Sequence, residues 1–292
     1  MDKTVGIIGL GIMGGAIARN LVDRGWTVVG TDVDQSRCTE LSAAGVRIAA
    51  GAADVARAAP TILTSLPSPK AVAAVAKEIA EAGVERRIVA EVSTLALDDK
   101  LAFQQTLAAA GHVPLDCPLS GTGAQAKNRD LVVYASGDAA AIQSLSQLFG
   151  DFGRKTVNLG AFGNGSRMKF IANLLVAVNN VASAEAMVLA MKAGLNPDDV
   201  VDVIGAGAGT SRVFELRAPM MAQDVYEPAT MRVSTWQKDM AVIEAFAREL
   251  GCETPCFSAT RPIYDEAMRQ GLGDQDTAAV CRVLEDKAGF TR

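Results

Sequence analysis

The chain has 292 residues, 49% hydrophobic and 21% charged, which is enough for one large or two ordinary soluble domains. Its net charge of −5 offers no broad basic surface, so nucleic acid and anionic membranes are not expected partners. Five scattered cysteines and one histidine, His112, argue against a disulfide framework and a metal site. We expect no signal peptide and a cytoplasmic location.

The first elements in the chain predict a strand, a glycine-rich turn and a helix. Residues 5–8 are an apolar run, and Gly9-x-Gly11-x-x-Gly14 follows at once. Gly9 permits a tight turn, Gly11 lets the backbone approach a pyrophosphate, and Gly14 lets the helix pack on the strand. Asp32, after a second apolar strand, is placed to bind ribose hydroxyls. The spacing predicts a dinucleotide site; the alternative is a similar turn that binds no ligand.

The rest of the first half alternates between strand-like and helix-like segments, which predicts a mostly parallel sheet covered on both faces. Strands are expected at residues 27–30, 61–65, 88–92, 113–118, 131–135 and 156–159, and helices at 35–44, 70–82, 97–110 and 139–149.

After Gly163 the sequence predicts helices alone. The first of them, at residues 166–193, is apolar nearly all round, as a buried helix is. A membrane span is the rival interpretation, but Asn180 and Glu185 would be costly in lipid. Further helices are expected at residues 197–204, 213–221, 235–250, 255–270 and 277–284. The predicted domains are therefore 1–162, with an α/β fold, and 163–292, which is all helical.

Two other segments carry chemistry. Ser120 and Gly121 lie in a small-residue loop after a strand, and such a loop can hold a carboxylate or be a plain turn. Lys169 and Asn173 share one face of the long apolar helix. Burial lowers the pKa of a lysine, which makes it a usable acid–base group. The alternative for Lys169 is a solvent-facing side chain.

Together these segments resemble the β-hydroxyacid dehydrogenase family, which includes 3-hydroxyisobutyrate dehydrogenase and tartronate semialdehyde reductase. The resemblance extends over the whole chain and implies a Rossmann-type doubly wound sheet, an all-α domain and a long joining helix. The implied reaction is hydride transfer between NAD(H) and a small carboxylate-bearing hydroxy acid or its aldehyde. A homodimer or homotetramer is also implied. The motifs lie at residues 6–14, 116–121, 163–173 and 238–239.

The resemblance assigns roles residue by residue. Lys169 is the implied acid–base and Asn173 positions the substrate, whose carboxylate Ser120, Gly121 and Thr122 bind. The implied cofactor-binding residues are Gly9, Leu10, Gly11, Ile12, Met13, Gly14, Asp32, Leu66, Pro67, Thr94 and Lys238.

Some features leave alternatives open. Thr122 and Arg129 depart from the family's usual substrate loop, so the substrate is not defined. Asp32 would repel a 2′-phosphate, which favours NAD over NADP, although Arg37 lies five residues later. The rival functions are a 6-phosphogluconate dehydrogenase-like decarboxylase, an imine reductase and a non-enzymatic dinucleotide-binding module. The presence of Lys169 argues against the last two.

Overall fold

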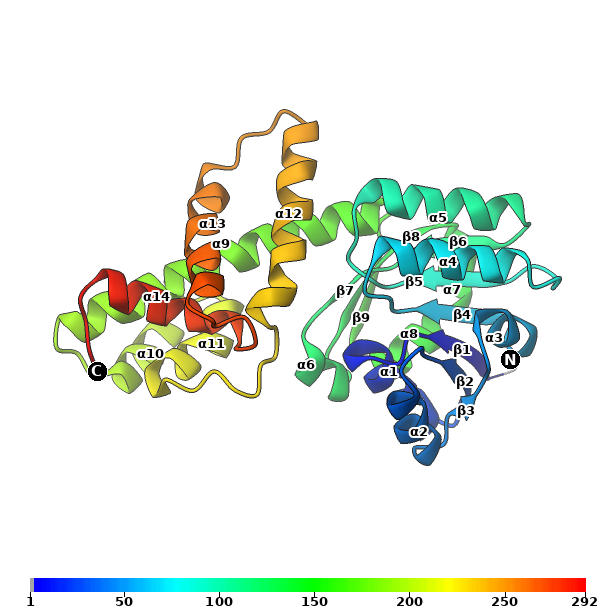
Figure 1. Cartoon of the computed structure of the whole chain (residues 1–292), viewed down its shortest axis with the longest axis horizontal. Coiled ribbons are helices and arrows are strands. Elements are labelled where there is room, and N and C mark those ends of the chain that lie inside the picture. The colour runs from blue at the N-terminus through cyan, green and yellow to red at the C-terminus, as the bar shows by residue number, and fades with distance from the viewer. Residues whose placement is uncertain (1–2) are drawn as a thin grey trace. The chain divides into compact units, whose positions relative to one another are not determined.

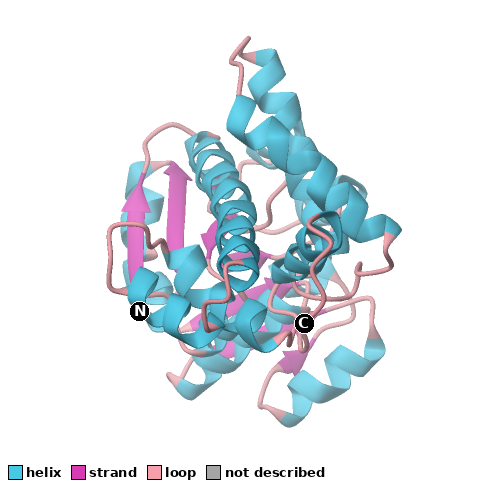
Figure 2. Cartoon of the chain, turned by 90° about the vertical axis from the view of Figure 1, so that its left-hand side faces the viewer, coloured by secondary structure: helices cyan, strands magenta, loops and turns pink. Residues whose placement is uncertain are grey.

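The computed structural model describes residues 3–292, and Figure 1 traces the chain from blue to red. The chain forms two compact units, Met1–Lys169 and Phe170–Arg292. Within the described residues all named strands belong to the first unit, and the second is built from helices. Figure 2 shows the strands in magenta and the helices in cyan. The expected α/β fold followed by an all-helical part is confirmed.

The sheet of the first unit has a doubly wound core. Six parallel strands take the order β3-β2-β1-β4-β5-β6, the order of dinucleotide-binding domains. β8 is antiparallel to β6, β7 is antiparallel to β8, and β9 is parallel to β8. Because β1, β4, β5 and β6 are parallel neighbours, the loops after them meet at one edge of the sheet. The strands are β1 (Thr4–Ile8), β2 (Thr27–Thr31), β3 (Arg47–Ile48), β4 (Thr61–Thr64), β5 (Ile88–Glu91), β6 (Val113–Asp116), β7 (Leu119–Ser120), β8 (Val132–Gly137) and β9 (Lys155–Asn158).

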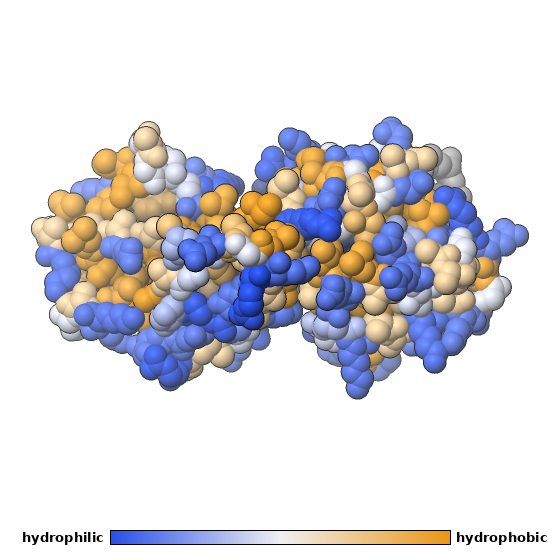
Figure 3. Space-filling view, turned by 90° about the horizontal axis from the view of Figure 1, so that it is seen from above, coloured by the Kyte–Doolittle hydropathy of each residue, from blue (hydrophilic) through white to orange (hydrophobic). Residues whose placement is uncertain are grey.

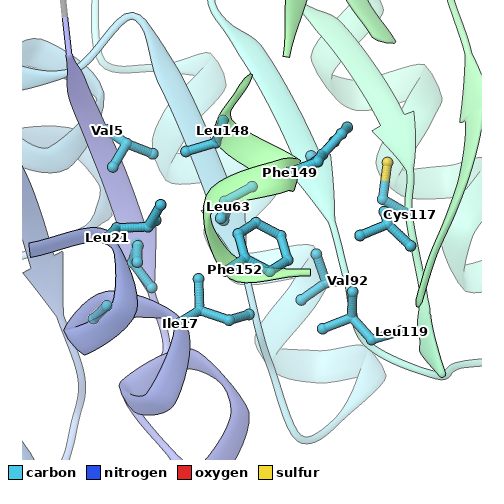
Figure 4. Packing of buried hydrophobic residues seen from close by; sticks show 14 of the residues in the cluster. Val5, Ile17, Leu21, Leu63, Val92, Cys117, Leu119, Leu148, Phe149 and Phe152 are labelled. Carbon is cyan, nitrogen blue, oxygen red and sulfur yellow. The ribbon is translucent and has the colours of Figure 1, made fainter. Parts of the chain in front are cut away.

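Successive residues of a strand point to opposite faces of the sheet. Both faces of this sheet are apolar, so helices cover both. Ile7 and Ile8, adjacent on β1, belong to two different buried clusters. Ile17 and Phe152 join the first cluster (Figure 4), and Phe103 joins the second. The helices are α1 (Ile12–Asp23), α2 (Gln35–Ala43), α3 (Ala52–Ala58), α4 (Pro69–Ala80), α5 (Leu97–Ala109), α6 (Gly123–Lys127), α7 (Ala139–Ser144) and α8 (Ser146–Phe152).

Several short elements differ from the sequence-based expectation. The single helix expected at 139–149 is two helices, α7 and α8, which meet at Leu145. Four short elements were not expected: β3, α3, β7 and α6. The two strands have two residues each and the two helices have seven and five, too few to show a periodic pattern.

The second unit is helical, and its long helix α9 begins in the first unit. Trp236 and Tyr264 pack in its core, with ring centroids 6.3 Å apart, and Phe257 is buried there too. The elements are α9 (Asn164–Lys192), α10 (Pro197–Gly205), α11 (Arg212–Gln223), α12 (Val233–Glu249), α13 (Pro255–Arg269), the 3₁₀ turn η1 (Thr277–Ala279) and α14 (Val280–Lys287).

Helix α9 is long and apolar enough to cross a membrane by length and composition, with a mean hydropathy of 1.6 in its most apolar window. Half of that window is nevertheless buried inside the protein. Asn180, in the middle of the helix, donates hydrogen bonds to Tyr264 Oη and to the Thr277 carbonyl, each at 2.9 Å. These polar contacts with neighbouring helices identify α9 as the core helix of a soluble fold.

Candidate active site

The glycine-rich turn between β1 and α1 has the geometry that its spacing predicts. Gly9 has a φ of +92°, and a Cβ on it would lie 2.1 Å from the Ser65 carbonyl oxygen. A Cβ on Gly14 would lie 1.9 Å from the Gly9 carbonyl oxygen. A Cβ on Gly11 would meet only the guanidinium end of the Arg37 side chain, with Nη1 at 3.1 Å. Gly9 and Gly14 are therefore required for packing, whereas Gly11 leaves its backbone accessible to a ligand.

The N-terminus of α1 fits a diphosphate. Gly11 is its N-cap, and among the described residues no side chain caps this end of the helix. The first backbone N–H groups, on Ile12 and Met13, therefore face the glycine-rich turn with the positive end of the helix dipole behind them. This is the arrangement with which doubly wound folds bind the pyrophosphate of a dinucleotide.

Asp32 lies just after β2 and is tied to the same turn. Its Oδ2 accepts a hydrogen bond from the Leu10 N–H at 2.6 Å, and its Oδ1 accepts one from the Asp34 N–H at 2.9 Å. Arg37 Nη1 lies 3.6 Å from Asp32 Oδ2 and Nε lies 3.4 Å from Asp34 Oδ2. A carboxylate has about four acceptor positions, so two remain for ribose hydroxyls.

The loops after β4 and β5 meet at the carboxyl edge of the sheet. Ser93 Oγ accepts a hydrogen bond from the Leu66 N–H at 2.7 Å, which joins the two loops. Pro67 follows Leu66, and Thr94 follows Ser93, so three of the predicted cofactor-binding residues lie on these connected loops. β4 lies next to β1 in the sheet, which places the loops beside the glycine-rich turn.

The predicted substrate loop has a more defined structure than expected. Ser120 ends β7, opposite Val132 of β8. Gly121 has a φ of +134°, and a Cβ there would lie 2.6 Å from Leu131. The Thr122 N–H donates to Gln125 Oε1 at 3.0 Å and caps α6, which begins at Gly123. Gly123, the first residue of α6, is buried.

The first turns of α9 carry Lys169, which is half-buried. Three residues before it, the N–H and hydroxyl of Ser166 donate to the Asp116 carboxylate at 2.7 Å and 2.8 Å. These bonds attach the beginning of the helix to the end of β6. Lys169 is therefore held on a helix whose start is fixed to the sheet edge that carries the cofactor and substrate loops.

In the second unit, Asn173 is hydrogen-bonded to Asp239 of α12, which also pairs with Lys238. Its Nδ2 donates to Asp239 Oδ2 at 3.0 Å, and Lys238 Nζ lies 3.1 Å from Asp239 Oδ1. Asn173 and Asp239 are both buried. The structure thus connects two residues that were predicted separately, Asn173 and Lys238, through the carboxylate of Asp239.

The buried thiol of Cys117 is not a reactive thiolate. Burial raises the pKa of the Cys117 thiol, and the charge of Asp116 raises it further, so this thiol remains protonated at neutral pH. Within residues 3–292, no group of three or more histidine, cysteine, aspartate and glutamate side chains is arranged to hold a metal ion.

Sequence reasoning did not identify a buried charged cluster that underlies the site. Glu91, Lys100 and Asp116 are fully buried and in mutual contact through the lysine. The signal available in the sequence was an acidic residue at the end of each of two apolar strands. Lys100 gave no signal, since charged residues are common on helices that cover a sheet.

Comparison with known proteins agrees with this geometry. Residues 4–160 match the family model for the NAD binding domain of 6-phosphogluconate dehydrogenase. Residues 163–284 match the model for the NAD-binding region of NADP-dependent 3-hydroxyisobutyrate dehydrogenase.

Relatives align over nearly the whole chain. Glyoxylate/succinic semialdehyde reductase 1 of Arabidopsis thaliana is 30% identical, over 96% of this chain and 98% of its own. L-threonate dehydrogenase of Haemophilus influenzae is 31% identical, over 97% and 95%. The structure of 3-hydroxyisobutyrate dehydrogenase from Mycobacterium tuberculosis superposes with a TM-score of 0.88 at 26% identity, over 97% and 99%. The chain belongs to the β-hydroxyacid dehydrogenase family of NAD(P)-dependent oxidoreductases.

Proposed function

We propose that this enzyme transfers a hydride between NAD(H) and a small β-hydroxyacid or its semialdehyde, with Lys169 as the acid–base. The observation that carries the proposal is a half-buried lysine on a helix whose first turn is hydrogen-bonded to the sheet edge. The relatives named above act on threonate and on glyoxylate or succinic semialdehyde, which are small carboxylates with a hydroxyl or carbonyl group.

In this mechanism the residues of the chain bind, orient and move one proton. Nicotinamide, when bound, supplies or takes the hydride. Ser120, Gly121 and Thr122 bind the substrate carboxylate, and Asn173 orients the reacting carbon. During reduction, Lys169 Nζ donates its proton to the carbonyl oxygen as negative charge develops there, and during oxidation the neutral amine removes the hydroxyl proton.

The cofactor preference and the domain boundary are each supported by one feature. The negative charge of Asp32 at the end of β2 supports NAD(H) over NADP(H). The change from alternating strands to helices alone supports a boundary between residues 162 and 163.

A stripe of exposed apolar residues on α9 supports a homodimer or a homotetramer. Ile171, Leu175 and Leu189 are 54%, 54% and 72% exposed, and their spacing places them along one side of the helix. Figure 3 shows apolar side chains exposed among polar ones on this view of the surface. Covering a leucine side chain stabilises by about 1.5–3 kcal/mol, so a second copy of the chain would gain from packing here.

The decisive experiment compares Lys169→Ala with the parent enzyme. NADH consumption is followed against a panel of semialdehydes, glyoxylate and cyclic imines. The parent should reduce the carboxylate-bearing aldehydes, and Lys169→Ala should lower kcat by about 10²–10⁴-fold. The Kd for NADH, measured by fluorescence, should change little.

Arg167→Ala is the matched control, since Arg167 is an exposed cation on the same turn that bonds to Asn164. It should retain parental activity. A Lys169→Ala enzyme within a few-fold of the parent would refute the acid–base assignment. Turnover of imines alone would favour an imine reductase instead, and no turnover with NADH binding would favour a binding module.

A further inference from the structure

A lysine and two carboxylates are fully buried below the sheet edge of the first unit. Lys100, on the first turn of α5, is hydrogen-bonded to Glu91 Oε2, and its Nζ lies 3.1 Å from Asp116 Oδ1. The side chains of all three residues have no exposed surface. Burying an ion costs several kcal/mol unless it is well paired, so this cluster calls for a physical explanation.

The cluster has one positive and two negative side chains, and a helix supplies the missing compensation. Ser166, at the beginning of α9, donates its N–H and its hydroxyl to Asp116. Ser136 Oγ lies 3.3 Å from Asp116 Oδ2 and accepts the Gly165 N–H at 2.9 Å. A helix N-terminus carries roughly half a positive charge. Asp116 is therefore shared between Lys100 and the first turn of α9.

Glu91 likewise has two partners, which are Lys100 and the loop after β5. Its Oε1 accepts the Ser93 N–H at 3.0 Å, and Ser93 Oγ in turn accepts the Leu66 N–H at 2.7 Å. In each carboxylate, one oxygen contacts Lys100. The other oxygen accepts a hydrogen bond from a segment that carries predicted site residues. Lys100 is the group that connects the two carboxylates.

We propose that Lys100 is a positioning residue that fixes the start of α9, and with it Lys169, relative to the loops after β4 and β5. This inference rests on the proposed function, because it assigns the effect of Lys100 to proton transfer by Lys169. Without the ammonium, two buried carboxylates face each other and separate, and the first turn of α9 moves with Asp116. A misplacement of about 1 Å at a reacting group costs about a hundredfold in rate.

The test is a double-mutant cycle in kcat between positions 100 and 169, at saturating NADH and aldehyde. Lys100→Met should lower kcat by about 10- to 100-fold with Lys169 present. It should have little further effect in the Lys169→Ala background, since a positioning residue acts through the group that it positions. The Kd for NADH should change by less than the kcat, and Lys100→Arg should restore part of the rate.

A second variant protects the test against misfolding. Glu91→Gln combined with Lys100→Met removes one charge of each sign and keeps an amide oxygen for the Ser93 N–H. This double variant should fold, and its loss of kcat should likewise appear only when Lys169 is present. Lys77→Met, on the exposed face of α4 where Lys77 pairs with Glu81, is the control and should leave activity unchanged.

The outcomes separate this inference from the proposed function. If Lys169→Ala alone retains the parental kcat, the proposed function fails. If Lys169→Ala is impaired but Lys100→Met lowers kcat by the same factor in both backgrounds, the positioning role alone is overturned. Failure of both position-100 variants to fold would likewise overturn it, in favour of an ion pair that only stabilises the fold.

Discussion

At the scale of single residues, Asp32 combines a structural contact with a proposed cofactor contact. Its position in the sequence predicts only the second of these. Asp32 accepts the Leu10 N–H, which fixes the glycine-rich turn, and in the proposed cofactor site its negative charge lies beside the adenosine ribose. Arg37 lies beside it and partly offsets that charge. The proposed preference for NAD(H) therefore depends on the balance between these two side chains.

Asp32→Asn should shift cofactor preference toward NADPH. The amide oxygen can still accept the Leu10 N–H, whereas the charge that repels a 2′-phosphate is removed, so the ratio of kcat/KM for NADPH to that for NADH should rise by at least about tenfold. Steady-state kinetics with both cofactors measures it. Arg37→Ala should shift the ratio in the opposite direction, and a parent enzyme that uses both cofactors equally would contradict the assignment.

At the scale of elements, a buried carboxylate holds the segment before α12 to η1. Asp276 accepts hydrogen bonds from Thr230 N–H and Oγ1 at 2.8 Å and 2.7 Å and from the Ala278 N–H at 3.0 Å, and Arg217 Nε lies 3.5 Å away. Burial by itself raises the pKa of Asp276, but Arg217 and these hydrogen bonds outweigh it, so the pKa lies below its usual value. The charged form is therefore favoured in the folded state.

This shift predicts acid sensitivity. The unfolded carboxyl has a pKa of about 3.9, so the stabilisation is fully present above that pH and is lost as the pH falls through the lower folded value. Asp276→Asn should lower the free energy of unfolding at pH 7 by about 3–5 kcal/mol, since Arg217 is left buried without its partner.

Urea unfolding between pH 7 and pH 3 measures this effect, and the difference between parent and variant should shrink below about pH 4. Asp274→Asn is the control, because Asp274 is exposed and pairs with Arg232 at the surface. Its stability should stay within about 0.5 kcal/mol of the parent. A constant difference between parent and Asp276→Asn over the whole pH range would contradict the assignment.

At the scale of the whole molecule, the proposed assembly depends on the exposed apolar stripe of α9. Light scattering at micromolar concentration should give a mass of at least twice the 30.4 kDa of one chain. Leu189→Arg places a charge on the stripe and should shift the mass toward the monomer. Leu250→Arg, at a leucine that is 63% exposed outside α9, should not. A parent enzyme that is monomeric under these conditions would refute the assembly.

The cofactor turn and the order of the long elements could be predicted from the sequence because their determinants are local. Gly9, Gly11, Gly14 and Asp32 lie within one strand–helix–strand unit, where spacing alone defines the geometry. Long helices and buried strands likewise show their period within a few residues. The apolar character of the long helix α9 is likewise visible in the local sequence.

Only the tertiary structure brought together residues that lie far apart in the chain. Lys100 meets Glu91 and Asp116 because helix α5 packs against the neighbouring strands β5 and β6, and Asn173 meets Asp239 across 66 residues. No local pattern encodes such pairs, since a charged residue on a helix has the same sequence signature whether it faces water or another charge. The sequence by itself therefore determined the strand–turn–helix unit of a dinucleotide-binding domain, whereas the substrate-binding residues remain a prediction. The packing of the folded chain decided which buried charges hold that site in place, because the energy of a buried charge depends on its partners rather than on its sequence neighbours.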